Sequence, residues 1–237
     1  MKKYIRYFIL LAFLVFLNHA LNAQIYDIGV FGGVSYNKLI PEKNTISNTL
    51  FIRDGIGKPG VFIGMNYAIG PPKDQPKKGL DIKSKLLVEA SYGKGGSYMT
   101  FTYSNPNGNK KTTEIEYTFY RGDYSAKLAL GLKKFQFVIG PTVTNIFYSG
   151  MDISGVDKTR SATGDFASIS IGYELGVGIE GDAANISLRY QRNASDFGQR
   201  FMATPAKINN YQIRLMLAYR IYRKHNGINR RSINWHK

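Results

Sequence analysis

The chain has 237 residues, of which 43% are hydrophobic, 14% aromatic and 20% charged, and its formal net charge is +16. This composition excludes a disordered or collagen-like chain and fits one folded domain. The absence of cysteine excludes disulfides, thiolate metal sites, cysteine nucleophiles and the lipidated cysteine of a bacterial lipoprotein. The three histidines, His19, His225 and His236, lie near the chain ends. We therefore expect no enzyme that uses a histidine base.

The N-terminal segment predicts export. Three basic residues within 1–6 precede an unbroken apolar run of eleven residues, Tyr7–Leu17. This arrangement is typical of a secretory signal peptide, because a membrane-spanning helix needs about 20 apolar residues. We expect cleavage after Ala23, which gives a signal peptide over 1–23. Cleavage after Ala20, or retention of the signal in the membrane, is the alternative.

Beyond the signal, apolar residues recur at every second position, which is the period of a β-strand. In 168–180, for example, large apolar residues alternate with glycine, serine and glutamate. The pattern predicts eight strands: Ile25–Asn37, Pro59–Ile69, Leu80–Tyr103, Lys110–Leu132, Lys134–Phe147, Ala167–Glu180, Asn185–Asp196 and Asn209–Tyr222.

The connections between these strands alternate between long and short, as in outer-membrane barrels. We therefore predict an all-β fold, an eight-stranded antiparallel up-and-down transmembrane β-barrel over 24–222, with both termini in the periplasm. A soluble sandwich or lipocalin-like barrel is the alternative, but it would place the large apolar residues inside. Five tyrosines near strand ends fit an aromatic girdle at the membrane interface: Tyr36, Tyr67, Tyr92, Tyr211 and Tyr219.

The opposite face of the strands carries charges of both signs. It comprises Asp27, Asn66, Lys83, Lys85, Glu89, Asp123, Lys127, Glu174, Glu180, Arg189, Gln191, Arg214 and Arg220. An unpaired charge inside a narrow barrel would cost several kcal/mol. We therefore predict a polar network that fills the lumen, formed by Glu89, Lys127, Glu174, Arg189, Arg214 and Arg220. The expected pairs are Glu89 with Lys127 and Glu174 with Arg189, and an open anion-favouring channel is the alternative.

The strands 80–103 and 110–132 are far longer than the roughly 9 to 11 residues that cross a bilayer. Their surplus must project outward. It is rich in aromatic residues, which are favoured at protein interfaces. The candidate partner-binding residues are Tyr98, Phe101, Tyr103, Tyr117 and Phe119. The alternative is that this hairpin folds against the long loops of the barrel itself.

Several segments resemble one family in their order and spacing. They are Leu86–Gly96, Ile115–Tyr117, Ser125–Leu128 and Phe137–Pro141, together with Asn22–Gln24, Gly29–Gly33 and Ser35. Across nearly all of the mature chain, the sequence resembles the small outer-membrane β-barrels of Bacteroidetes, the PorT-like family. The resemblance implies an outer-membrane barrel and a link to type IX protein secretion.

No catalytic residue, cofactor or metal site is predicted. The run Gly176–Gly181 matches G-x-G-x-x-G but lies inside a predicted strand, with no helix to hold a pyrophosphate. The tail 223–237 carries five basic residues and no acidic one. It is either a periplasmic anchor for an acidic partner or anionic membrane surface, or a solvated end. Export argues against nucleic acid as the partner of this basic chain.

We therefore expect a non-enzymatic outer-membrane barrel that acts as a subunit or scaffold of an envelope complex. Its expected partners are membrane lipids and envelope proteins. A small outer-membrane pore and a surface-loop adhesion protein are the alternatives.

Overall fold

The computed structural model describes residues 25–41, 45–47, 50–70, 82–104, 107–132, 134–154, 160–161, 166–195 and 208–225. The predicted signal peptide, 1–23, and most of the predicted tail, 226–237, lie outside these ranges. No helix in the described part of the chain is long and apolar enough to cross a membrane.

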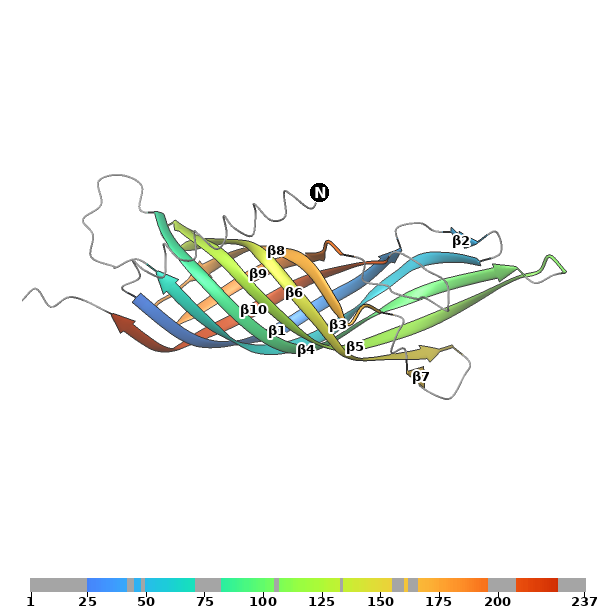
Figure 1. Ribbon diagram of the computed structural model, residues 1–237, viewed down its shortest axis with the longest axis horizontal. Helices are drawn as coiled ribbons and strands as arrows, with labels where there is room; N and C mark the ends of the chain where they lie inside the picture. Colours follow the sequence, from blue (N-terminus) through green and yellow to red (C-terminus); the bar gives the residue numbers. More distant parts are fainter. Residues whose placement is uncertain are drawn as a thin grey trace, which may run out of the picture.

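The described residues form ten antiparallel strands in one sheet (Figure 1). They are β1 (Ile25–Pro41), β2 (Thr45–Ser47), β3 (Leu50–Gly70), β4 (Ile82–Ser104), β5 (Lys110–Leu132), β6 (Phe135–Ile153), β7 (Arg160–Ser161), β8 (Ile169–Glu180), β9 (Ala184–Asn193) and β10 (Ile208–His225). Eight of them follow the order β1-β10-β9-β8-β6-β5-β4-β3, and pairing of β1 with β3 closes the ring. The short β2 and β7 are attached to β3 and β6. The predicted eight-stranded up-and-down barrel is confirmed.

Several strands are longer than the alternation predicts. β1 continues to Pro41 and β3 begins at Leu50, so much of the predicted long loop 38–58 is strand. The register of β3 on β4 shifts between Asp54 and Gly57 and again between Lys58 and Val61. Each such bulge moves the following residues to the opposite face of the sheet. The strand therefore does not show a strict alternation of apolar and polar residues in the sequence.

The other end of the sheet also extends further than predicted. β10 runs to His225, and its Arg223 Nε lies 2.7 Å from Asp27 Oδ1 on β1. The predicted boundary between barrel and tail, at 222, is therefore three residues too early. The first residues assigned to the tail belong to the barrel wall.

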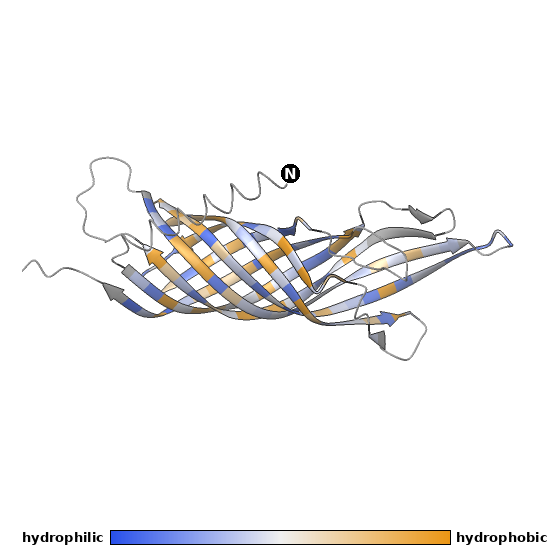
Figure 2. Ribbon diagram, viewed as in Figure 1, coloured by the Kyte–Doolittle hydropathy of each residue, from blue (hydrophilic) through white to orange (hydrophobic). Residues whose placement is uncertain are grey.

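A belt of exposed apolar side chains surrounds the barrel, with members on all eight long strands. Examples in ring order are Val34, Leu215, Leu188, Leu175, Ile139, Leu130, Val88 and Ile63, each at least 37% exposed. In Figure 2 hydrophobic and hydrophilic residues alternate along the strands of the barrel. Exposure of a continuous apolar belt to water would be unfavourable, whereas lipid matches it, and a closed barrel leaves no strand edge in the hydrocarbon. The barrel is therefore of the transmembrane type.

The alternation inverts along β5. Between Tyr120 and the C-terminal end of the strand, outward residues such as Leu130 are apolar and inward residues such as Lys127 are polar. Beyond Tyr120, towards the hairpin tip, the inward residues are apolar and buried, and the outward residues Glu114 and Glu116 are charged. Polar outward residues belong in water, so β5 leaves the membrane near Tyr120. The β4–β5 hairpin projects beyond the barrel wall in Figure 1.

A cluster of buried apolar side chains fills the barrel where it extends past the membrane. This hairpin cluster consists of Leu39, Met99, Phe101, Ile115, Tyr117, Phe119, Phe166 and Ile208. The ring of Phe166 packs edge-on against Tyr117 and Phe119, with centroids 5.3 and 4.8 Å apart. The cluster joins β1, β4, β5 and β10 to the segment that precedes β8.

The hairpin cluster corrects the predicted partner-binding set. Phe101, Tyr117 and Phe119 are at most 2% exposed, while Tyr98 and Tyr103 are half-buried. The prediction failed because Leu39, Phe166 and Ile208, which cover these rings, lie in segments predicted as loops. The hairpin folds against the rest of the chain, which was the alternative.

Candidate functional site: the filled lumen

Charged side chains from five strands meet in the middle of the barrel. This central network consists of Glu89 on β4, Asp123 and Lys127 on β5, Glu174 on β8, Arg189 on β9 and Arg214 on β10. Each of the six residues is at most 6% exposed. Strand alternation places them all on the inner face.

Lys127 lies at the centre of the network. Its Nζ is 2.6 Å from Glu89 Oε2 and 2.5 Å from Glu174 Oε1. Arg189 Nη1 lies 2.8 Å from Glu89 Oε2 and 2.9 Å from Glu174 Oε1. Both predicted pairs are present, and they form one cluster of two carboxylates and two cations. Neutralisation and charge-assisted hydrogen bonds make burial of these groups tolerable.

A glycine leaves room for this cluster. A Cβ on Gly176 of β8 would lie 2.8 Å from Cγ of Arg189. The long arginine side chain therefore passes across a position that any side chain would crowd. The glycine-rich inner face of β8, which the sequence shows as small residues, accommodates the large cation of the neighbouring strand β9.

Arg214 connects this cluster to Asp123. Its Nη1 is 3.3 Å from Glu174 Oε2, and its Nη2 is 3.0 Å from both Asp123 Oδ2 and Ser91 Oγ. Its guanidinium also lies 4.4 Å from the ring centroid of Phe62. Arg214 therefore ties β10 to β3, β4, β5 and β8 through one side chain.

Asp123 is held by neutral donors as well as by arginine. Thr144 Oγ1 donates to Asp123 Oδ1 over 2.6 Å, and Gln191 Nε2 donates to the same oxygen over 3.3 Å. Arg121, which the sequence analysis did not identify, lies with Nε 3.4 Å from Asp123 Oδ2. Its spacing of two residues from Asp123 on one strand was the signal that could have placed it inside.

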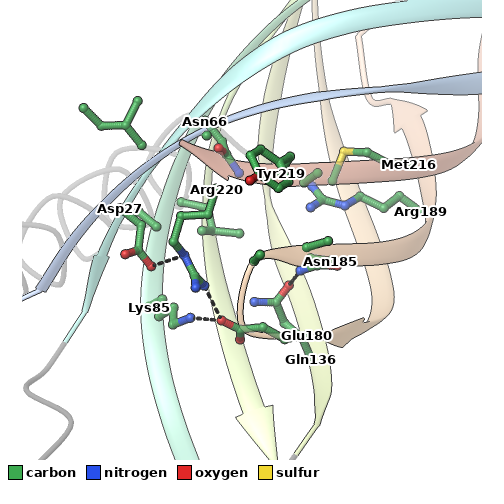
Figure 3. Close-up of a pocket in the computed structure, with 17 residues that line it drawn as sticks. Asp27, Asn66, Lys85, Gln136, Glu180, Asn185, Arg189, Met216, Tyr219 and Arg220 are labelled. Carbon is green, nitrogen blue, oxygen red and sulfur yellow. Dashed lines mark hydrogen bonds and ion pairs between the residues drawn. The ribbon is translucent and has the colours of Figure 1, made fainter. Parts of the chain in front are cut away.

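Arg220 forms ion pairs inside the barrel, as predicted, but it belongs to a second group that is separate from the central network. This rim network consists of Asp27, Lys85, Glu180, Arg220 and Arg223, at the end of the barrel opposite the hairpin. Asp27, Lys85, Glu180 and Arg220 are labelled in Figure 3. Arg220 Nε lies 3.3 Å from Asp27 Oδ2, and its Nη2 lies 3.2 Å from Glu180 Oε1. Six residues along a strand span about 20 Å, which separates Arg220 from Arg214.

The remaining space in this end of the lumen is small. A cavity of about 50 Å³ lies among Asp27, Gln136, Arg189 and Arg220. Asn185 Nδ2 donates to Gln136 Oε1 over 2.8 Å on its wall (Figure 3). A cavity of this size has room for only a few waters.

Taken along the barrel axis, the rim network, the central network and the hairpin cluster occupy successive levels of the interior. The charged groups of the two networks are paired with one another. Within the described ranges, no group of three or more His, Cys, Asp or Glu side chains could hold a metal ion. The ion pairs of the central network connect the strands across the lumen.

Comparison with known proteins gives a fold likeness only. No protein-family model and no curated protein matches the chain. Neisserial surface protein A and Ail, the attachment invasion locus protein of Yersinia pestis, solved with the heparin analogue sucrose octasulfate, each give a TM-score of 0.43 at 11% identity. The first match covers 83% of this chain and 97% of the other, and the second covers 82% and 98%. The NanC porin gives 0.28 at 6% identity, covering 82% of this chain and 98% of the porin.

Proposed function

We propose that this protein is a closed, non-enzymatic outer-membrane β-barrel that acts as a scaffold or subunit of an envelope complex. The observation that carries the proposal is the central network, in which six charged side chains from five strands are buried against one another. Charge pairing across the lumen favours a closed, rigid barrel over a pore or an active site.

The location in the outer membrane is supported by two features. Antiparallel barrels with an even number of strands and an apolar outer belt are characteristic of bacterial outer membranes. The predicted signal peptide over 1–23 would direct the chain across the inner membrane. With eight strands, both ends of the barrel wall then lie on the periplasmic side.

The pore alternative has less support. A water-filled path would have to separate Lys127 and Arg189 from Glu89 and Glu174, and would break the buried ion pairs between them. It would also have to open the hairpin cluster, which lies at a second level of the lumen. Two independent obstructions of opposite chemistry are consistent with a barrel that does not conduct.

Planar-bilayer recordings of the purified full-length protein test closure. We expect no steady conductance, with a porin in the same bilayers as the positive control. Steady openings in most insertions would overturn the proposal.

We propose the scaffold role because the paired charges of the lumen favour neither a pore nor an enzyme. The resemblance to the PorT-like family makes type IX protein secretion the kind of complex we propose. Affinity purification from native membranes in mild detergent should recover the barrel with a reproducible set of envelope proteins. Deletion of the gene should impair protein secretion if the complex is of this kind. Recovery of the barrel alone would contradict the scaffold role.

The exposed hairpin tip offers a matched variant for that purification. Lys110 and Lys111 are exposed at the outer end of β5, away from the buried cluster. Replacing both by glutamate should leave the barrel folded, because neither side chain contributes to the hairpin cluster. Loss of partner proteins with this variant would place the contact at the tip.

A further inference from the structure

The lipid-facing surface has a groove. It has a volume of about 500 Å³, is almost entirely apolar and crosses β5, β6, β8, β9 and β10. Its walls include Leu130, Ile139, Leu175, Leu188, Tyr190 and Ile213, and Gly176 lies in its floor. Five strands at a spacing of about 4.8 Å give it an extent of about 20 Å across the strands.

A cation lies at the end of this groove nearest the hairpin side of the barrel. Arg192 is two residues beyond Tyr190 on the outer face of β9, and Tyr211 is two residues beyond Ile213 on β10. The guanidinium of Arg192 lies 5.0 Å from the ring centroid of Tyr211. The rings of Tyr190 and Tyr211 are 6.2 Å apart and connect this pair to the groove wall.

A second cation follows in the same row. Arg192 is in register with Tyr211, and Tyr211 is in register with Lys38 on β1. The two cationic residues are therefore separated by two strand spacings, about 10 Å. The row Arg192, Tyr211 and Lys38 therefore places two basic side chains on the outer face of three adjacent strands.

The row stands at the depth of lipid headgroups. Below it on β10 and β1 lie exposed apolar residues such as Leu215 and Val34, and β9 ends at Asn193, one residue beyond Arg192. Long basic side chains at such a boundary extend their charge to the headgroups while their stems remain against apolar surface. The apolar groove then lies within the acyl-chain layer directly beneath.

We propose that this row and groove bind one membrane lipid with an anionic phosphate headgroup in the leaflet on the hairpin side. The phosphate accepts hydrogen bonds from Arg192, whose planar guanidinium suits bidentate contact with phosphate oxygens. Stacking on Tyr211 holds the guanidinium in place, and Lys38 adds positive charge to the same row. An acyl chain of the lipid occupies the groove. The proposal is independent of the scaffold role, because it rests only on the outer wall.

Native mass spectrometry of the detergent-purified full-length protein tests the site, with dimyristoyl phosphatidylglycerol as the probe. We expect one lipid retained per barrel, and Arg192→Gln to lower its affinity about tenfold or more. The matched control is Lys94→Gln, because Lys94 Nζ lies 5.6 Å from the ring of Tyr120 in a similar pair away from the groove. Unchanged affinity in Arg192→Gln, or an equal loss in Lys94→Gln, would overturn the proposal.

The groove and the headgroup are tested separately. Val177→Trp fills the groove at an exposed, lipid-facing position without touching the cations, and should also lower the affinity; it decides the question if Arg192→Gln does not fold. Dimyristoyl phosphatidylcholine, whose phosphate is offset by a cation, should bind less tightly. Inorganic phosphate should not displace the lipid. Displacement by phosphate, equal binding of phosphatidylcholine, or no effect of Val177→Trp would each contradict a lipid site of this kind.

Discussion

The central network and the hairpin cluster fill the same barrel with opposite chemistry. Lys127 and Phe119 lie on the same inward face of β5, eight residues apart, and each is 1% exposed. One is fully charged and paired, the other aromatic and packed on Phe166. Burial alone therefore does not distinguish the two regions.

The medium outside the wall explains the difference. At membrane depth, apolar side chains are stable on the outside of β5, and the inner face can carry polar groups that satisfy one another. Beyond Tyr120 the outside of the strand meets water, so apolar burial inside becomes the stabilising arrangement, as in a soluble protein. The point at which the alternation inverts thus marks the membrane boundary more sharply than the length of the strand does.

The largest expected effect is from breaking the central network at Glu174, which contacts Lys127, Arg189 and Arg214. Glu174→Ala leaves three buried cations short of a shared carboxylate and should lower the free energy of unfolding by about 3 to 5 kcal/mol. Denaturant unfolding in lipid vesicles measures the change. Glu174→Gln, which keeps the size and an acceptor oxygen, should cost less. A loss below about 1 kcal/mol in Glu174→Ala would show that the network is not a stabilising element.

The hairpin cluster should respond locally. Phe119→Ala removes a ring that packs on Phe166 and should cost about 3 kcal/mol, near the low end for such changes because the surrounding strands can close on the gap. Hydrogen exchange should show lost protection in the outer parts of β4 and β5, with the strands at membrane depth unchanged. Equal loss of protection throughout the barrel would mean that the two regions unfold as one unit.

The sequence predicted the barrel and the paired charges well because both follow from alternation. Once Glu89, Lys127, Glu174 and Arg189 lie on the inner face of a narrow barrel, the opposite charges are expected to pair across it. Absolute register was not available from the pattern, so the sequence did not show that the polar network of the lumen divides into two groups, with Arg220 in the second. Its six-residue distance from Arg214 separates two networks that the sequence presents as one polar face.

The hairpin cluster could not be predicted in the same way. Its inward residues on β4 and β5 are visible in the sequence, but Leu39, Phe166 and Ile208 come from segments where bulges, glycine and lysine interrupt the alternation. Without these covering residues, the aromatic rings look like an exposed surface that needs a partner. The aromatic residues of the hairpin were identified correctly, but the residues that cover them, Leu39, Phe166 and Ile208, were not.

A charge on the outer face distinguishes the two media directly. Leu175→Arg places a cation on the lipid-facing belt and should cost about 2 to 4 kcal/mol if the residue lies near mid-membrane. Thr112→Arg, an exposed outward position of β5 beyond Tyr120, should change stability by less than about 0.5 kcal/mol. Heat-modifiable migration on gels and denaturant unfolding compare the two. Equal effects would mean that the boundary drawn at Tyr120 is misplaced.

The smallest expected effect concerns an ion pair outside the membrane. Lys58 pairs with Glu116, and their side chains are 25% and 27% exposed, whereas that of Glu89 in the central network is 4% exposed. Glu116→Gln should cost less than about 1 kcal/mol, because solvent screens a partly exposed pair. Its effect should disappear in 1 M salt, where the screening length is about 3 Å. Glu89→Gln should remain strongly destabilising at the same salt concentration, since ions do not reach the closed lumen. If salt removed both effects alike, the interior would be accessible to ions, and the closed barrel would have to be replaced by a conducting one.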